Sequence, residues 1–254
     1  MNLQDLLDEL AKNILRDRSD LISGPDDYLW SDDTLVKYIA EAEQFLARKG
    51  LVIRDSITPA VCELALVAGQ TQYVLHPSVI AVISAQADGD PGDLSRAGHA
   101  AFNTYTAPSN QFFDPSQLST LSPGKPLAYS TDETVDKVSG KTGVVSMRVY
   151  PAPTADYEGM IIRLRVVRKP IKILSVDDLT AVPEVPEDYH LGLLDWAAYR
   201  ALRNLDSDAG GVEKAGAYKA EFDDMVKQAR VDAMRKLFAP LGWGFGRGGF
   251  VWEN

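Results

Sequence analysis

The residues from which a zinc or nucleophilic site could be built are few and far apart. The three histidines, His76, His99 and His190, show no i,i+4 partner and no HExxH pattern, so no two of them are placed on one helix face as zinc ligands. The single cysteine, Cys62, alternates with apolar neighbours in AVCELALV, which is typical of a core thiol. No GxSxG nucleophile elbow occurs. We therefore predict no catalytic residue and no zinc site.

One short segment, residues 140–142, resembles the end of a phosphate-binding loop. Gly140-Lys141-Thr142 ends as such a loop does, but Val135 stands where the motif requires a glycine. The flanking runs have a strand pattern rather than the strand–loop–helix context of a phosphate cradle, so we predict a hairpin turn here.

An acidic turn offers the remaining candidate ligands. Asp88, Asp90 and Asp93 in DGDPGD carry oxygens of the kind that calcium prefers, but the twelve-residue spacing and closing glutamate of an EF-hand are missing. A solvated acidic turn is the preferred interpretation. We expect no metal and no cofactor, and we expect that the protein is not an enzyme.

The composition and net charge of the chain limit the kinds of partner that it can bind. Of the 254 residues, 45% are hydrophobic and 24% are charged, as in an ordinary globular protein. The net charge of −10 argues against a surface that grips nucleic-acid phosphates. No apolar run reaches the roughly 18–20 residues that a membrane span needs. We expect a protein made in the cytoplasm without a membrane span.

Both ends of the chain have helical periodicity. Leucines and an isoleucine recur at three- and four-residue spacing in residues 3–15. A second helix is predicted from Ser31 as N-cap to Gly50 as the stop signal, with its buried stripe formed by Leu35, Ile39, Ala42 and Leu46. After residue 176, Pro186 predicts a helix start, with Leu191 and Leu194 on the inward face. A last helix is predicted after DSDAGG, with Ala215, Tyr218, Phe222, Met225, Ala229 and Ala233 inward.

The middle of the chain has strand periodicity. In residues 161–166, Ile162, Leu164 and Val166 alternate with Arg163 and Arg165, as in a strand with one solvated face. Residues 87–126 are rich in Gly, Pro, Ser, Asp and Asn, which predicts a long loop. The expected fold class is therefore α+β: a helical bundle from both chain ends (1–50 and 176–238), an inserted antiparallel β-sandwich or barrel (51–175, with the loop 87–126), and an extended C-terminal arm (239–254).

The C-terminal arm has an unusual composition. Its sequence, APLGWGFGRGGFVWEN, places aromatic residues among five glycines, and such a segment is a poor helix former. Exposed aromatics of this density are typical of docking anchors. We predict a docking arm whose contact residues are Trp243, Phe245, Arg247, Phe250 and Trp252.

The two helical ends resemble tailed-bacteriophage head–tail adaptor (connector) proteins. The resemblance lies in LWSDDTLVKYIAEAEQFLARK (29–49) and in VPEVPEDYHLGLLDWAAYRALRNLDSDAGGVEKAGAYKAEFDDMVKQA (182–229), and it covers neither the β-rich segment nor the arm. It implies a structural virion protein of the neck, which forms a ring, commonly twelve-fold, between portal and tail. The implied partners are further copies of the chain, the portal protein, a tail or nozzle protein, and double-stranded DNA that passes without specific binding.

The resemblance also assigns roles to residues. The arm would dock on the portal, and an acidic channel wall would keep DNA from sticking. Packing within the bundle or between subunits is expected of Trp30, Leu35, Ile39, Leu46, Leu194, Ala198, Leu202, Tyr218 and Phe222. The alternative function is a virion-associated receptor- or carbohydrate-binding protein that acts through loop aromatics, namely Phe102, Tyr105, Phe112 and Phe113.

Overall fold

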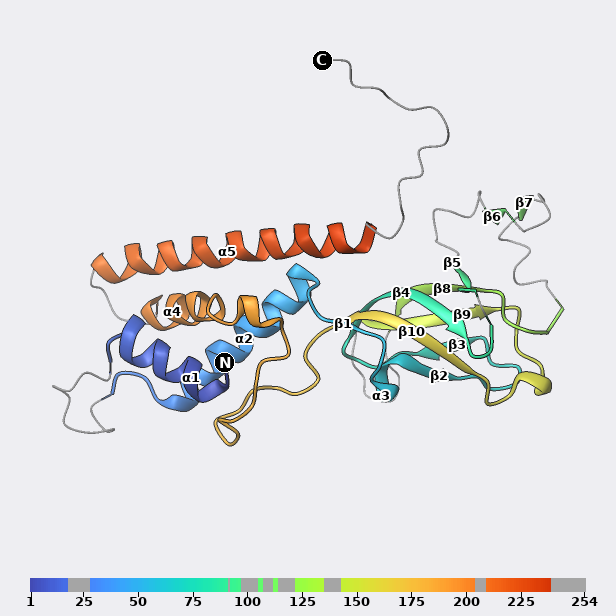
Figure 1. Cartoon of the computed structure of the whole chain (residues 1–254), viewed down its shortest axis with the longest axis horizontal. Helices are drawn as coiled ribbons and strands as arrows, with labels where there is room; N and C mark the ends of the chain where they lie inside the picture. Colours follow the sequence, from blue (N-terminus) through green and yellow to red (C-terminus); the bar gives the residue numbers. More distant parts are fainter. Residues whose placement is uncertain are drawn as a thin grey trace, which may run out of the picture. The chain divides into compact units, whose positions relative to one another are not determined.

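The chain folds as two compact units. The computed structural model describes residues 1–17, 28–90, 92–96, 105–106, 112–113, 122–134, 143–203 and 209–238. Unit 1 comprises Met1–Ile53 and Pro170–Asn254, and unit 2 comprises Arg54–Lys169. Both ends of the chain therefore belong to unit 1, and unit 2 interrupts its sequence (Figure 1).

Unit 1 is helical. Its elements are α1 (Leu3–Asp8), the π-helical turn η1 (Glu9–Ile14), α2 (Asp32–Gly50), the 3₁₀ turn η5 (Glu187–Tyr189), α4 (Leu193–Arg203) and α5 (Ala209–Phe238). None of the helices in the described ranges is long and apolar enough to cross a bilayer.

A capping box begins α1. The backbone N–H of Asp5 donates to Asn2 Oδ1 at 2.8 Å, and the backbone N–H of Asn2 donates to Asp5 Oδ2 at 3.1 Å. The predicted apolar stripe is confirmed, because Leu3, Leu6, Leu7 and Leu10 are buried and Ile14 and Leu15 pack against the same core.

The predicted N-cap of α2 and its predicted end at Gly50 are both confirmed. Ser31 Oγ accepts the N–H of Thr34 at 3.3 Å. The left-handed residue after the helix is Leu51 (φ 56°), whereas Gly50 is the last helical residue. Gly50 is confined by packing, since a Cβ there would lie 3.2 Å from Leu46 and 3.4 Å from the Cβ of Ala229.

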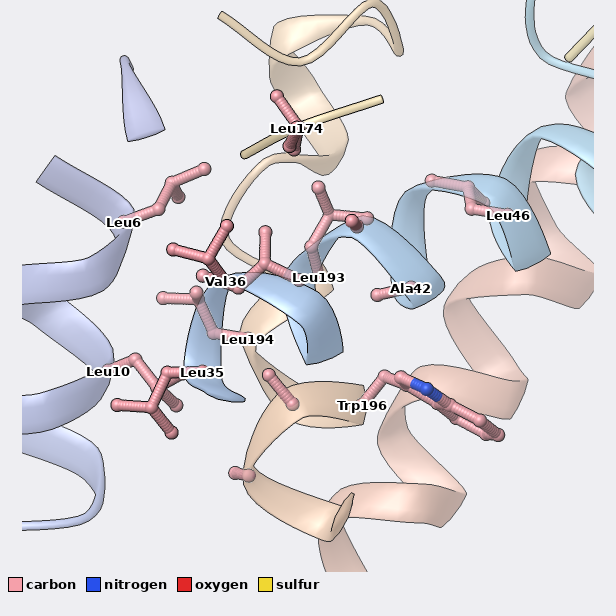
Figure 2. Close-up of a cluster of buried hydrophobic side chains, with 14 of the residues drawn as sticks. Leu6, Leu10, Leu35, Val36, Ala42, Leu46, Leu174, Leu193, Leu194 and Trp196 are labelled. Carbon is pink, nitrogen blue, oxygen red and sulfur yellow. The ribbon is translucent and has the colours of Figure 1, made fainter. Parts of the chain in front are cut away.

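Aromatic rings join α2, α4 and α5 in one core. The ring of Trp196 stacks on Phe45 with centroids 5.0 Å apart and meets Phe222 at 5.2 Å. Figure 2 shows Leu6 of α1 and Leu10 of η1 beside Leu35 and Val36 of α2 in the same cluster. Of the side chains with a predicted packing role, the buried ones are Trp30, Leu35, Ile39, Leu46, Leu194, Ala198 and Phe222, and the partly buried ones are Leu202 and Tyr218.

The predicted helix start at Pro186 is wrong. Residues 187–189 form a 3₁₀ turn, and further i→i−3 bonds link Leu193 N–H to the His190 carbonyl and Leu194 N–H to the Leu191 carbonyl before α4 is established. Because these turns are tighter than an α-helix, side-chain directions shift. Leu191, predicted to face inward, is 58% exposed.

The last helix begins at Ala209, three residues earlier than predicted, so it includes the last three residues of the predicted break DSDAGG. Its predicted inward face is confirmed: Ala215, Phe222, Ala229 and Ala233 are buried, and Tyr218 and Met225 are partly buried. A Cβ on Gly192 would lie 2.0 Å from Met225 Sδ, so close contact of α5 with the start of α4 requires a glycine at this position.

Residues 170–185 form a connecting segment rather than the continued strand that the sequence predicted to residue 175. Strand pairing ends at Arg168, and Pro170, which has no N–H, follows. The segment is held to α1 by the bonds from Leu3 N–H to the Ala181 carbonyl (2.8 Å) and from Gln4 N–H to the Leu179 carbonyl (2.9 Å). It therefore belongs to the helical unit.

Unit 2 is β-rich. Its strands are β1 (Arg54–Asp55), β2 (Glu63–Ala65), β3 (Gln72–Val74), β4 (Val79–Ala87), β5 (Ser95–Arg96), β6 (Tyr105–Thr106), β7 (Phe112–Phe113), β8 (Ala128–Thr134), β9 (Val144–Tyr150) and β10 (Ile161–Arg168). Short helical turns are α3 (Pro59–Cys62) and η4 (Ala155–Tyr157).

The described strands form two four-stranded sheets and a two-stranded ribbon. In sheet A, β10 pairs with β1, β2 and β4; sheet B has the order β3-β9-β8-β5; β6 pairs with β7. The described strands close no barrel, and the expectation of a wholly antiparallel domain is wrong in one place, because β5 pairs parallel with β8. The mixture of helices and sheets agrees with the α+β class.

The alternation predicted for β10 is confirmed. Ile162, Leu164 and Val166 are buried, while Arg163 and Arg165 are exposed. Their inward side chains share one buried cluster with Val82 of sheet A and with Tyr129, Met147 and Val149 of sheet B. Both sheets therefore contribute to a single core.

Two predicted loops are only partly described. β8 and β9 pair antiparallel with Thr134 opposite Val144, as a hairpin requires, but residues 135–142, which include the predicted turn, lie outside the described residues. Within the loop 87–126, β6 and β7 place Tyr105 opposite Phe113 and Thr106 opposite Phe112, and Phe102 lies outside the described residues.

Candidate interaction surfaces

The two described histidines serve local structure in separate units. His76 Nδ1 lies 2.8 Å from Ser78 Oγ and accepts the Ser78 backbone N–H at 3.2 Å, so its ring holds a local turn. His190 is buried, with Nε2 2.9 Å from the Val185 carbonyl oxygen. His99 lies outside the described residues.

The acidic turn is neutralised by nearby cations. Asp90 forms an ion pair with Lys125 at 2.7 Å, and Asp88 lies 3.5 Å from Arg163 Nε. Asp93 is exposed. No group of three His, Cys, Asp or Glu residues in the described part of the chain is arranged to hold a metal ion.

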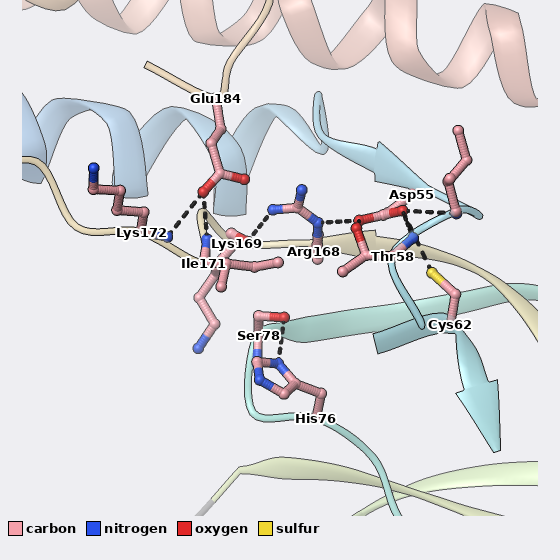
Figure 3. Close-up of polar contacts among 11 residues, drawn as sticks. Asp55, Thr58, Cys62, His76, Ser78, Arg168, Lys169, Ile171, Lys172 and Glu184 are labelled. Atoms are coloured by element: carbon pink, nitrogen blue, oxygen red, sulfur yellow. Dashed lines mark hydrogen bonds and ion pairs between the residues drawn. The ribbon is translucent and has the colours of Figure 1, made fainter. Parts of the chain in front are cut away.

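A buried polar network lies where unit 2 begins and ends (Figure 3). Asp55 Oδ1 accepts the backbone N–H groups of Ile57 (2.9 Å) and Thr58 (3.0 Å), and Asp55 Oδ2 accepts the hydroxyl of Thr58 at 2.7 Å. Arg168 Nε donates to the same oxygen at 2.6 Å. Burial alone would raise the pKa of Asp55, but these hydrogen bonds hold it well below its usual value.

Cys62 belongs to this network as a buried thiol. It is 1% exposed, as the sequence indicated, and its Sγ lies 3.5 Å from Asp55 Oδ1. Burial, followed by the negative charge of Asp55, raises the pKa of Cys62 to about 11. A protonated thiol of this kind is a poor nucleophile, so the network is structural.

Unit 1 exposes several large apolar side chains in its irregular segments. Leu29 is 68% exposed, Ile173 64% and Val182 58%, and Ile171 is also exposed. Scattered apolar residues are normal on a protein surface. Three of these four, however, lie on the connecting segment 170–185, whose backbone is firmly held.

The connecting segment is held by side-chain bonds to its backbone. Glu184 Oε1 accepts the N–H groups of Ile171 (2.7 Å) and Lys172 (2.9 Å), as Figure 3 shows. Glu43, a buried carboxylate of α2, accepts the N–H of Glu184 at 2.5 Å. Lys172 pairs with Asp178, and Leu174 inserts into the core. An ordered segment that presents isoleucine and valine to solvent is a candidate protein-binding surface.

Unit 2 offers a basic surface on the outer face of sheet A. Arg163 and Arg165 project from β10, and Arg54 of β1 lies on the same face, since it pairs with Val167 two residues after Arg165. Burial, and then the positive charge of Arg165, lowers the pKa of Arg54.

The predicted docking arm cannot be placed. Trp243, Phe245, Arg247, Phe250 and Trp252 lie outside the described residues. Of the predicted packing residues, all but Leu202 lie in or against the core of unit 1, and Leu202 and Tyr218 are only partly buried. The sequence analysis did not identify Ile171, Ile173 or Val182, although apolar residues on both sides of the acidic pair Asp177-Asp178 were a usable signal.

The sequence pattern of a protein family described as SU10 adaptor protein matches residues 1–243. The match spans both units and ends at Trp243, within the predicted arm 239–254. No curated protein matches the chain.

Proposed function

The chain belongs to the SU10 adaptor protein family of phage head–tail adaptors, and from that premise we propose that it forms a ring, twelve-fold as in similar adaptors, between the portal and the tail in the neck of the virion. The observation that carries the proposal is a family match over nearly the whole chain. In this proposal unit 1 is the helical bundle and unit 2 is the inserted β-domain.

Exposed apolar side chains support an assembly role. A closed ring needs a heterologous interface, in which two different surfaces of one chain meet on neighbouring copies. The connecting segment provides Ile171, Ile173 and Val182 on a backbone fixed by Glu184 and Glu43. A preformed apolar surface loses little conformational entropy on binding.

The proposed ring surrounds the DNA channel. A wall of negative charge repels the phosphate backbone, so the genome passes without adhering. The net charge of −10 supports this part of the proposal.

The C-terminal arm is proposed to dock on the portal. Its glycines would let the backbone follow a crevice, and its aromatic residues would each bury about 150–250 Å² in pockets of the partner. Arg247 would pair with an acidic group there. The tail or nozzle protein would bind the opposite end of the ring.

Light-scattering mass tests the proposal. The full-length protein and a variant ending at Ala239 are measured alone and mixed with the portal. We expect the full-length chain to join the portal ring and the shortened chain to fail. If the shortened chain binds equally well, the arm has no docking role while the adaptor function stands. If neither binds and both stay monomeric at high concentration, the adaptor function itself is wrong.

A further inference from the structure

The long helix α5 is packed on one side only. On its inward side, Phe222 contacts the rings of Phe45 of α2 and Trp196 of α4. Figure 1 shows α4 running along this side of α5. The opposite side is exposed and includes Val231, an apolar side chain that is 43% exposed. One side of a 30-residue helix is therefore accessible to another molecule.

The exposed side of α5 has a periodic stripe of its own. Its positions follow one another in alternating steps of three and four residues, namely Ala217, Ala220, Asp224, Lys227, Val231 and Met234. The first five are exposed, and Met234 is half-buried. Alternating steps of three and four give the heptad pattern by which one helix pairs with another along its length. These six residues are called the outer stripe below.

The outer stripe is complementary to itself when it is reversed end over end. Its midpoint lies between residues 225 and 226, and reversal exchanges Asp224 with Lys227, Ala220 with Val231, and Ala217 with Met234. Each exchange joins opposite charges or sets a small side chain against a larger one. Two antiparallel copies of the stripe therefore match in charge and in size, whereas parallel copies would place each charge against its like.

The charges along the whole of α5 favour the same orientation. Residues 213–224 have four acidic and two basic side chains, a net charge of −2, whereas residues 225–236 have one acidic and four basic side chains, a net charge of +3. An antiparallel partner places the acidic half of one helix beside the basic half of the other, and it also opposes the two helix dipoles. The central charges are accessible, since Asp224 is 75% exposed and Lys227 is 74% exposed.

We propose that the outer stripe of α5 pairs antiparallel with the same stripe of a second copy of the chain, which gives a dimer with two-fold symmetry. Within one chain, Lys227 Nζ lies 2.7 Å from Asp224 Oδ1, so pairing brings four alternating charges together around the symmetry axis. Ala217 and Ala220 allow the two helices to approach closely, because their side chains are small.

This dimer goes beyond the proposed ring and does not depend on it. Neighbours in a cyclic ring meet through two different surfaces, whereas a two-fold contact uses the same surface on both chains and is complete with two copies. Pairing through α5 therefore cannot build the ring. The outer stripe serves the free protein, in which it holds the copies in pairs.

Charge reversal tests the pairing in solution. Light scattering at rising protein concentration, without the portal, gives the concentration at which half of the chains are paired. K227E places like charges around the axis, and symmetry repeats the change on both chains. We expect the half-pairing concentration to rise about tenfold or more, where tenfold equals about 1.4 kcal/mol.

K37E is the matched control for K227E. Lys37 is a 70% exposed lysine of helix α2 that also pairs with an aspartate, Asp33. The control therefore changes the net charge equally and breaks an ion pair of the same kind, and it should leave the half-pairing concentration unchanged. Circular dichroism checks that both variants are folded.

Mixing two variants should restore the pairing. D224K alone should weaken pairing as K227E does. In an equimolar mixture, D224K chains should pair with K227E chains, because each mixed contact again joins opposite charges.

Cysteine cross-linking determines the orientation. Residue 220 of one chain lies opposite residue 231 of the other, while like-numbered positions lie about 16 Å apart along the axis. Disulfide formation requires Cα atoms within about 7 Å. Oxidation should therefore link A220C to V231C in a mixture and should link neither variant to itself. The native Cys62 does not interfere, since it is 1% exposed.

Other outcomes overturn the inference in distinguishable ways. If the wild type stays monomeric at its highest soluble concentration, or if K227E and K37E weaken pairing equally, α5 is not the contact. If A220C links to itself, the helices do not pair in the antiparallel register. If K227E, unlike K37E, fails to join the portal, the stripe is a contact of the virion assembly instead. The proposed ring fails separately, when the wild type pairs through α5 but does not bind the portal.

Discussion

Arg168 and Asp55, 113 positions apart, form a 2.6 Å ion pair that joins the last residue of β10 to β1. The side chains are 11% and 7% exposed. Beside the pair, the backbone of Arg54–Asp55 lies antiparallel to Val166–Val167. The two ends of unit 2 are thus held together by groups that both belong to unit 2.

The first prediction concerns this ion pair. Asp55→Asn keeps an acceptor for the turn but removes the charge opposite Arg168. We expect the free energy of unfolding to fall by about 2–3 kcal/mol at neutral pH, because the buried guanidinium of Arg168 loses its carboxylate partner. Urea unfolding monitored by circular dichroism measures it. Asp33→Asn, which removes an exposed pair with Lys37, is the control and should cost about 0.5 kcal/mol or less.

The Asp55 effect should depend on pH in one direction. Since folding lowers the pKa of Asp55, its contribution is complete above the unfolded pKa of about 4 and is lost as the pH falls toward the folded value. The difference between wild type and Asp55→Asn should shrink below about pH 4. A difference that grows on acidification would contradict this account.

The second prediction concerns Gly192. Gly192→Ala would place a Cβ 2.0 Å from Met225 Sδ, so α5 or the Met225 side chain must move. We expect the free energy of unfolding, measured by thermal or urea denaturation, to fall by about 1–3 kcal/mol. Adding Met225→Ala should remove the clash, so the double variant should be more stable than the sum of the two single changes implies.

Gly216→Ala is the matched control for Gly192→Ala. Gly216 is an exposed residue inside α5, with nothing within 4 Å of an added Cβ. Alanine is the better helix former by about 0.5–1 kcal/mol, so this variant should be stabilised. Equal destabilisation of both variants would mean that the contact with Met225 is not the cause.

The third prediction concerns Asp195, whose pKa is raised to about 6 by burial and by Glu221. Because folding raises the pKa of Asp195, its protonated form favours the folded chain. This contribution to the free energy of unfolding is complete below about pH 4 and is lost as the pH rises through about 6. Asp195→Asn should therefore be more stable than wild type at pH 7, by about 1 kcal/mol after allowance for solvent screening, and equal to it near pH 4. Unfolding curves at the two pH values decide the matter.

The fourth prediction concerns Cys62. Because the thiol is buried and its pKa is raised to about 11, an aromatic disulfide reagent should not modify the folded protein at pH 8. Denaturant should expose one reactive thiol per chain. Rapid labelling of the folded chain would show that the network around Asp55 opens easily.

Local signals were sufficient for much of the fold. The Ser31 cap, the leucine stripe of α1, the inward face of α5 and the alternation in β10 each depend on residues a few positions apart, so the sequence predicted them correctly. The prediction failed at Leu191, where packing decided the backbone: a 3₁₀ turn turned Leu191 outward.

The candidate surfaces depended more on the tertiary structure. The sequence by itself determined the helical ends, the β-rich middle, the solvated Arg163 and Arg165, and the adaptor resemblance. Only the tertiary structure placed Arg54 on the same sheet face as Arg165, joined Arg168 to Asp55, and fixed Ile171 on the surface through Glu184. Each of these contacts joins residues far apart in the chain, and their partners are chosen by strand register and core packing, which no short stretch of sequence contains.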